Sequence, residues 1–406
     1  MLKNRDIIFF GLPRHDGPDN GSTSFFIAKE LAKKNRVLYV DDPYTQKAFI
    51  SNIKRREIKQ RLKHYFPFSP GISEWANDEV SLKTLTVPPT ISINSLNAGP
   101  LYTFLQGINT FIIGKRIERA IKKLGFSNII FINSFNFYYP GLEKFISPSL
   151  YIYHCIDGMI KTYTLRHGPR LETRLMKSAD AVISTSPELQ RLKGLVNPNS
   201  FCIPNAADFK HSSKALSPET PVAAELESLP RPIIGYIGNI ERRIDYSILE
   251  AIAKKQPSWS FVLLGPVEPR FIPNIIFSIP NIHFVKFQPF QRVPEFLKGF
   301  DVAMIPFKID EISRTIIPLK LNEYLGAGRP VVSTCFNPDV MKQKDGVIFI
   351  ADTPELFTDA ISQALASNNE FNIEKRLEIA RNNTWDRIGE DFSELLDTLL
   401  VKSKKN

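Results

Sequence analysis

The chain has 406 residues, 43% of them hydrophobic and 11% aromatic, which excludes a disordered protein and predicts two domains rather than one. The formal net charge of +10 is unevenly placed. Residues 1–206 carry 28 basic and 16 acidic side chains, a net +12, whereas residues 207–406 carry 24 and 26, a net −2. An excess of cations in one half favours an anionic partner, either nucleic acid, anionic lipid or a small anionic substrate, with an incidentally basic surface as the alternative.

Two further features bear on cellular location. No apolar run approaches the roughly 18 to 20 residues that span a bilayer, and the apolar stretch before Pro13 is too short for a signal peptide, so it is interpreted as a first strand. The three cysteines have no metal or disulfide spacing, which predicts a reducing cytoplasm; they are Cys155, Cys202 and Cys335.

The first half alternates buried strands with helical stretches. A helix with a Ser/Thr cap is predicted over 22–34. Apolar runs without polar alternation are typical of a parallel sheet covered on both faces. These runs are predicted as strands at 6–12, 36–43, 128–135, 150–156 and 180–186.

Residues 205–232 are rich in Ser, Pro and charge and predict the domain junction. The alternation then restarts, and a last amphipathic helix is predicted over 384–403. The resulting fold class is α/β, with two doubly wound, Rossmann-like domains at 1–206 and 207–383 facing a cleft. Strands of the second domain are predicted at 232–239, 260–266, 282–287, 301–307, 330–336 and 347–351.

Ligands of open parallel sheets bind where the strands end. The segment "GYIGNIERRIDY" ends a strand in Gly238 and offers Arg243 before a helix, a pattern that suits phosphate oxygens, although a solvated loop would look the same. In "IIPLKLNEYLGAGRPVVST", Lys320 and Glu323 fall on one face of a first helical turn. The amides and Lys320 suit a diphosphate, and Glu323 suits ribose hydroxyls; a helix-capping carboxylate is the alternative.

The segment "PLKLNEYLGAGRPVVST" resembles the donor-site motif of the glycosyl transferases group 1, enzymes of the GT-B fold that use nucleotide sugars. The similarity is clearest over about residues 180–350, with "ADAVISTSPELQ" and "YIGNIERRIDYSILEAIAKKQPSWSFVLLGP" as further segments. The N-terminal "LPRHDGPDNGSTSFFIAKELAKKNRVLYVDDP" is similar to a subgroup that makes bacterial cell-surface polysaccharides.

The resemblance implies roles for individual residues. Glu323 would bind the ribose, Lys320 and Arg243 would hold the diphosphate, and Gly238 would leave room for the sugar phosphate. The resemblance also implies an acceptor-binding first domain and a C-terminal helix, 384–406, that crosses back to pack on it.

Two more positions are expected to meet the base through their backbone, Lys286 and Phe287. The sequence departs from the family pattern at Thr315, where an acid usually stands eight residues before the glutamate. The arginine that commonly follows the strand glycine is also missing from "GNIERR".

In the first domain, Asp157 follows a predicted strand and is the candidate base for an acceptor hydroxyl, with a structural acid or helix cap as the alternative. His15 and Asp16 follow the first strand and are further candidates on the acceptor or phosphate side. Gly21, in the helix start "NGSTS", is another, although plain capping explains it equally well. His154 is predicted to be a buried, structural histidine.

Two segments, 47–68 and 101–125, mix cations with aromatic and aliphatic residues. This composition predicts contact with an anionic membrane surface. RNA is not favoured, because no nucleic-acid recognition motif is present. The alternative is a pair of ordinary helices whose apolar sides meet the core.

The predicted function is transfer of a hexosyl group from a UDP- or GDP-linked sugar to a glycan or polyprenyl-diphosphate-linked acceptor during cell-surface polysaccharide synthesis. No metal or other cofactor is expected, because the chain lacks D-x-D, G-x-G-x-x-G after the first strand and Cys/His clusters. The expected location is cytoplasmic, on the inner face of the membrane. Alternatives are a nucleotide-sugar epimerase of the same fold and a catalytically decayed membrane scaffold.

Overall fold

The computed structural model describes residues 2–12, 14–15, 22–66, 68–159 and 162–403. The chain forms two compact units. Unit 1 comprises Met1–Pro204 together with Ile388–Asn406, and unit 2 comprises Asn205–Arg387. The boundaries predicted from the sequence are 206/207 and 383/384.

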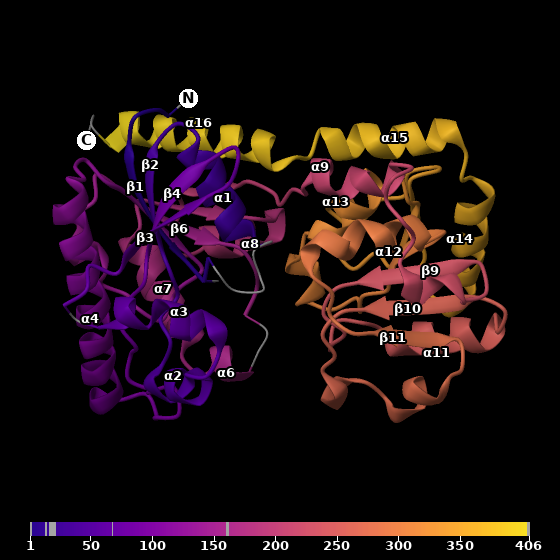
Figure 1. The fold of residues 1–406 in the computed structure, drawn as a ribbon, viewed down its shortest axis with the longest axis horizontal. Helices are drawn as coiled ribbons and strands as arrows, with labels where there is room; N and C mark the ends of the chain where they lie inside the picture. Colours follow the sequence, from indigo (N-terminus) through magenta and orange to yellow (C-terminus); the bar gives the residue numbers. More distant parts are fainter. Residues whose placement is uncertain (1, 13, 16–21, 67, 160–161, 404–406) are drawn as a thin grey trace. The chain divides into compact units, whose positions relative to one another are not determined.

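Unit 1 contains an eight-stranded sheet, of which Figure 1 labels β1, β2, β3, β4 and β6. Its strand order is β3-β4-β2-β1-β5-β6-β7-β8. All neighbouring strands are parallel except β3 and β4, which form an antiparallel pair. The strands are β1 (Asp6–Gly11), β2 (Arg36–Val40), β3 (Ile72–Ala76), β4 (Ser81–Leu85), β5 (Ile130–Ser134), β6 (Leu150–Cys155), β7 (Ala181–Ser184) and β8 (Ser200–Cys202).

Helices and loops bury the central strands of unit 1. Every residue of β1, β5 and β6 is buried, which explains why these strands are continuous apolar runs rather than alternating ones. The helices of this unit are α1 (Thr23–Ala32), α2 (Gln46–Asn52), α3 (Arg56–Tyr65), α4 (Pro100–Leu124), α5 (Glu143–Ile146), α6 (Thr162–Leu165), α7 (Gly168–Ser178) and α8 (Pro187–Gly194).

Unit 2 contains a six-stranded, fully parallel sheet in the order β11-β10-β9-β12-β13-β14. Its strands are β9 (Ile233–Ile237), β10 (Ser260–Leu264), β11 (Ile282–Val285), β12 (Val302–Ile305), β13 (Val331–Ser333) and β14 (Ile348–Ile350). Its helices are α9 (Phe209–Ser212), α10 (Ala224–Glu227), α11 (Tyr246–Lys255), α12 (Val293–Gly299), α13 (Leu319–Gly326), α14 (Pro354–Ala366) and α15 (Glu370–Arg381).

The α/β class and the two Rossmann-like units are confirmed, and each predicted strand has a counterpart. The prediction missed β3, β4 and β8. It also treated 205–232 as a junction, whereas this stretch forms the short helices α9 and α10 within unit 2.

The last helix, α16 (Trp385–Ser403), belongs to unit 1 from Ile388 onward. Its Phe392 is fully buried and its ring lies edge-on against His154, with the centroids 5.4 Å apart. The Ser393 hydroxyl accepts a hydrogen bond from the Leu2 amide at 3.0 Å. These contacts place the C-terminal helix on the first sheet, as the resemblance implied.

Among the described residues, no helix has both the length and the apolar character that a membrane crossing requires. The three cysteines are free thiols; Cys155 is buried and the others are partly buried.

Candidate active site

Two glycines lie side by side at the C-terminal edge of the sheet in unit 2. Gly238 follows β9 and has a φ of 141°, and its N–H donates to the carbonyl of Leu264 at 2.9 Å. Gly265 follows β10 with a φ of 143°, and a side chain there would collide with the carbonyl of Gly238. A Cβ on Gly238 would lie 2.7 Å from Nζ of Lys320. The backbone angle favours glycine at 238, and a side chain there would also displace the Lys320 ammonium.

Lys320 points from the first turn of α13 toward this glycine turn. Its Nζ donates a hydrogen bond to the hydroxyl of Tyr236 at 2.8 Å and lies 4.0 Å from the centroid of that ring. The ring of Phe307 is 4.8 Å away. The helix begins after Pro318 with no side-chain cap, so no capping side chain satisfies its first amides. Cation and amides together are suited to an anion.

When no ligand is bound, the surroundings of Lys320 disfavour the charged form of its amine. Burial, reinforced by the positive charge of Arg243, lowers the pKa of Lys320 to about 7. Burial also raises the pKa of Glu323, and the positive charge of Lys320 only partly offsets this effect. An anion beside Lys320 would restore the charge of the amine, since a nearby opposite charge favours the ionised form.

Arg243 is held by an acid that the sequence analysis did not single out. Its Nε donates to the carboxylate of Glu241, which is buried, and its guanidinium lies 5.8 Å from the ring centroid of Phe307. The structure thus gathers Gly238, Arg243 and Lys320 around two aromatic rings. The missed residues Tyr236 and Phe307 carry no signal of function, because a buried aromatic residue at a strand end looks like part of the core.

Three further positions between Arg243 and Lys320 were singled out in the sequence. Lys286 and Phe287 follow β11 with exposed side chains, so their predicted backbone contact with a base stays a prediction. Thr315, which stands where the family has an acid, is buried, and its hydroxyl donates to the carbonyl of Ile312 at 2.7 Å.

In unit 1, His15 lies beyond the end of β1 and is largely buried. Its Nδ1 lies 2.9 Å from Oδ1 of Asp41, which also accepts from the His15 amide at 3.0 Å. Arg61 of α3 donates to the same carboxylate and to Thr86. Burial opposes charge on Asp41, but the hydrogen bond and charge of His15 and the charge of Arg61 hold its pKa below the usual value. Arg61 therefore does not belong to the exposed basic surface in which the sequence analysis counted it.

Asp157 follows β6, is partly buried, and accepts a hydrogen bond from the Gly158 amide at 2.8 Å. Its role as a base stays a prediction. His154 is fully buried, and burial lowers its pKa to about 3, which fits a structural side chain. Asp16 and Gly21 lie outside the described residues.

Within the described part of the chain, no group of three or more His, Cys, Asp or Glu side chains is arranged to hold a metal ion.

Residues 231–367 match the family described as "Glycosyl transferases group 1", and this segment contains every donor-side residue named above. In Bacillus subtilis, a protein named as a teichuronic acid biosynthesis glycosyltransferase, TuaH, is 24% identical over 275 residues. This match covers 61% of the present chain and 66% of TuaH.

Solved structures share the fold along nearly the whole chain. Sucrose-phosphate synthase of Thermosynechococcus elongatus has a TM-score of 0.66 at 14% identity, over 98% of this chain and 100% of that one. Trehalose 6-phosphate synthase of Burkholderia multivorans has a TM-score of 0.68 at 9% identity, over 99% of this chain and 100% of that one. The Anabaena protein HepE, solved with UDP and glucose, has a TM-score of 0.65 at 12% identity, over 97% of this chain and 100% of that one. The family match lies in unit 2, and the chain as a whole shares the GT-B fold of these structures.

Proposed function

We propose that the protein transfers a hexosyl group from a nucleotide-diphosphate sugar to a glycan or lipid-linked acceptor in cell-surface polysaccharide synthesis. The assignment of the donor to the nucleotide-diphosphate sugars rests on the position of Lys320, whose ammonium group lies between the first turn of α13 and the glycine turn at Gly238. Support comes from HepE, a protein of the same fold solved with UDP and glucose. The name of the relative TuaH supports a polysaccharide product.

In this proposal the bond between the anomeric carbon and the diphosphate oxygen breaks, and a bond to the acceptor oxygen forms. Lys320, Arg243 and the α13 amides neutralise the departing diphosphate, so no metal ion is needed for that task. Glu323 holds the ribose, and Asp157 takes the proton of the acceptor hydroxyl. The donor is UDP- or GDP-linked.

A thermal-shift panel of UDP- and GDP-sugars tests the donor class. At least one is expected to raise the melting temperature of the wild type and to have a much smaller effect on the Glu323→Ala variant, because ligands that bind the native state stabilise it by mass action. Glu250→Ala, on the exposed face of α11, is the matched control. Failure of every nucleotide sugar to stabilise the wild type contradicts the proposal, and product analysis with and without a glycan acceptor separates transfer from epimerisation.

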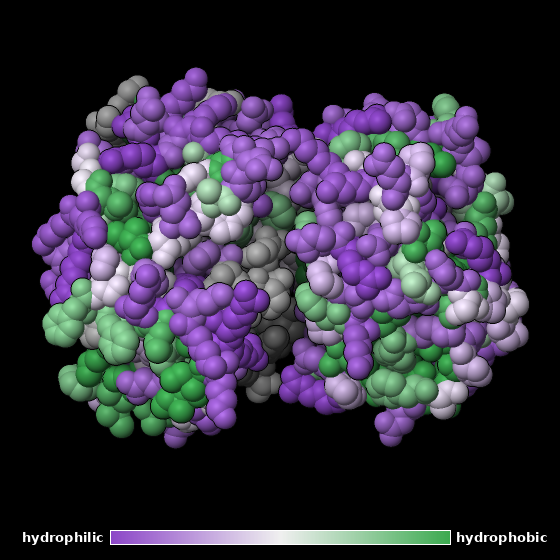
Figure 2. Space-filling model, in the orientation of Figure 1, coloured by the Kyte–Doolittle hydropathy of each residue, from purple (hydrophilic) through white to green (hydrophobic). Residues whose placement is uncertain are grey.

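We also propose that unit 1 docks on the anionic inner face of the membrane. Apolar side chains stand exposed on α2 and α4, among them Ile50 at 70%, Phe104 at 67% and Phe111 at 53% exposure. Figure 2 shows hydrophobic residues gathered over the end of unit 1 where Figure 1 places α2 and α4. Exposed cations of the α2–α3 segment are Lys47, Lys54, Arg55, Arg56, Lys59 and Lys63. Exposed apolar side chains together with exposed cations fit an anionic lipid surface.

Flotation on phosphatidylglycerol-containing vesicles is expected to carry the full chain upward at low salt and to fail on purely zwitterionic vesicles. The double variant Phe104→Ser/Phe111→Ser should float at most one-tenth as well, because each exposed ring contributes buried apolar area. Phe371→Ser, an equally exposed ring on unit 2, is the control. Equal flotation of the double variant and the control would refute this docking face.

A further inference from the structure

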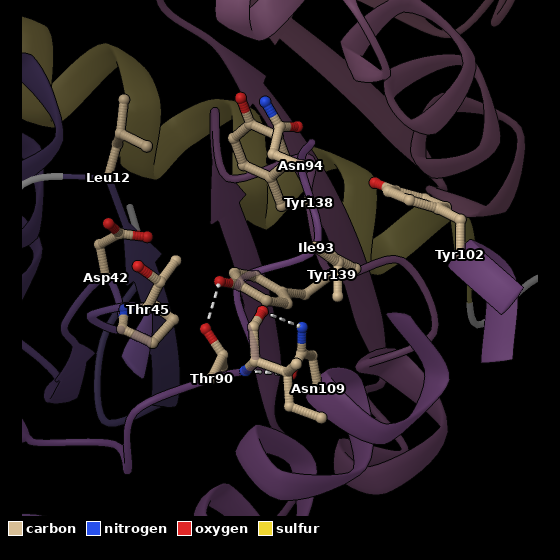
Figure 3. A pocket seen from close by; sticks show the side chains of 12 residues that line it. Leu12, Asp42, Thr45, Thr90, Ile93, Asn94, Tyr102, Asn109, Tyr138 and Tyr139 are labelled. Carbon is tan, nitrogen blue, oxygen red and sulfur yellow. Dashed lines mark hydrogen bonds between the residues drawn. The ribbon is translucent and has the colours of Figure 1, made fainter. Parts of the chain in front are cut away.

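A pocket of about 160 Å³ lies in unit 1 (Figure 3). Segments that follow β1, β2, β4 and β5 line it, with two residues from α4. The strand order reverses between β1 and β5, and such a switch point is where open parallel sheets bind ligands. The lining residues are Leu12, Asp42, Pro43, Thr45, Thr90, Ile91, Ile93, Asn94, Tyr102, Asn109, Tyr138 and Tyr139.

The walls of the pocket are held in place by hydrogen bonds. The Asn109 side chain accepts from the Ile91 amide at 2.7 Å and donates to the Ile91 carbonyl at 3.0 Å. The hydroxyls of Thr90 and Tyr139 lie 3.3 Å apart. The ring of Tyr102 is stacked on His167, with the centroids 4.0 Å apart. A shape fixed in this way lowers the entropic cost of binding a ligand.

Asp42 is the one charged residue among those that line the pocket. Asn136 donates to its Oδ1 at 2.9 Å, and Arg14 is 3.9 Å from its Oδ2. In Figure 3, Asp42 lies beside Leu12 and Thr45, on the opposite side of the pocket from Tyr102. A carboxylate has about four acceptor positions. In the described part of the chain, Asn136 is the one residue that donates a hydrogen bond to the Asp42 side chain, so the carboxylate retains acceptor capacity toward the pocket.

The raised pKa of Asp42 is consistent with this setting. Burial raises it to about 7, and the charge of Asp41 adds to the rise against the opposing effects of Arg14 and Asn136. A hydroxyl donated to the carboxylate would replace part of the hydration that burial removes.

We infer that this pocket binds one pyranose ring of the acceptor glycan, with a ring hydroxyl donating to the Asp42 carboxylate and the Tyr138 ring packing against the sugar. The assignment to the acceptor rests on the proposed function. Cavities on the order of 150 Å³ hold one six-membered ring. Aromatic rings offer apolar area to the C–H face of a sugar, while the carboxylate serves its hydroxyls.

Two other ligand classes fit the lining less well. A phosphate or diphosphate needs cations or clustered amides, and the lining residues include no Lys or Arg. An isoprenoid chain would place hydrocarbon against the Asp42 carboxylate and leave its remaining acceptor positions unfilled, a cost on the order of 1–3 kcal/mol. A sugar hydroxyl avoids this cost.

Saturation-transfer NMR on the full chain, without nucleotide, tests the inference. The probes are the methyl glycosides of glucose, galactose, N-acetylglucosamine and N-acetylgalactosamine, with farnesyl phosphate as the isoprenoid probe. At least one glycoside is expected to receive saturation from the wild type. Its affinity should fall about tenfold or more in Asp42→Asn, because a hydrogen bond to a charged acceptor is lost.

Asp78→Asn, an exposed acid in the same unit, is the matched control and should bind as the wild type does. Tyr138→Ala should lose binding, whereas Tyr138→Phe keeps the ring and should retain it. The isosteric Asp42→Asn change decides the outcome even if Tyr138→Ala does not fold, and the nucleotide-sugar thermal shift confirms the fold of each variant.

Three results would overturn the inference: no glycoside receives saturation, Asp42→Asn binds like the wild type, or farnesyl phosphate binds and the glycosides do not. The donor panel is scored separately. If nucleotide sugars bind and glycosides do not, the pocket assignment fails alone; if glycosides bind and nucleotide sugars do not, the proposed function fails alone.

Discussion

Replacing Lys320 with methionine is expected to lower kcat/KM for the donor by about 100- to 1,000-fold, the loss typical of one donor aimed at developing negative charge. The ammonium lies next to Gly238, whose lack of a side chain leaves room for the anion, and 4.0 Å from the centroid of the Tyr236 ring. Steady-state kinetics with the donor found in the thermal-shift panel measures the effect.

The melting temperature of Lys320→Met should be equal to or higher than that of the wild type. The depressed pKa of Lys320 means that its burial penalises the cation, so removing the charge does not weaken the fold. Lys254→Met is the control, because Lys254 forms an exposed pair with Glu250 on α11 and pairs of this kind contribute little. A loss of less than about fivefold in the Lys320 variant, with the fold intact, would remove Lys320 from the donor site.

Donor affinity is expected to be constant below pH 7 and to fall by up to about 100-fold between pH 7 and 9. Without ligand, the Lys320 amine has a pKa of about 7, so above that pH the free protein is increasingly unprotonated and binding must take up a proton. The diphosphate of a nucleotide sugar keeps its charge over this range. Neighbouring Arg243 stays charged, and burial raises the pKa of Tyr236 out of the range.

Titration calorimetry in two buffers of different ionisation enthalpy measures the proton uptake, which should approach one proton per donor near pH 8. Lys320→Arg is the control, because a guanidinium keeps its charge up to pH 9, and its donor affinity should not change with pH. A wild-type affinity that is equally flat would show that the amine does not titrate against the donor.

The strands that could be predicted from the sequence are fully buried ones, such as β1 and β6. Because both faces of these strands are buried, their residues form a continuous apolar run. Two of the missed strands, β3 and β8, lack this run because they lie at the edges of the first sheet, and the third, β4, lies next to the edge strand β3. Strand β3, "ISEWA", is half exposed along its length, and β8 has only three residues, all partly buried. An edge strand contacts neighbours on one side only, so its sequence resembles that of a loop.

Of the candidate site, the part that lies within one helix was predictable from the sequence, whereas contacts between distant segments were not. Lys320 and Glu323 stand three residues apart in one helix, and helical spacing can be read from the sequence. The contact between His15 and Asp41 spans 26 residues, and Arg61 joins them from another helix. Such a cluster exists only because β1 and β2 are neighbours in the sheet, and a single sequence does not record which strands pair.

The composition of unit 1 from two separated stretches of chain has a consequence for biosynthesis. When the ribosome has completed Pro204, the first sheet still lacks the helix that carries Phe392 and Ser393, and the surface around His154 is uncovered. Unit 2 is continuous in the chain and is synthesised in full before that helix emerges. The N-terminal lobe therefore matures last, and a nascent chain arrested before residue 388 would present an unfinished apolar face to chaperones.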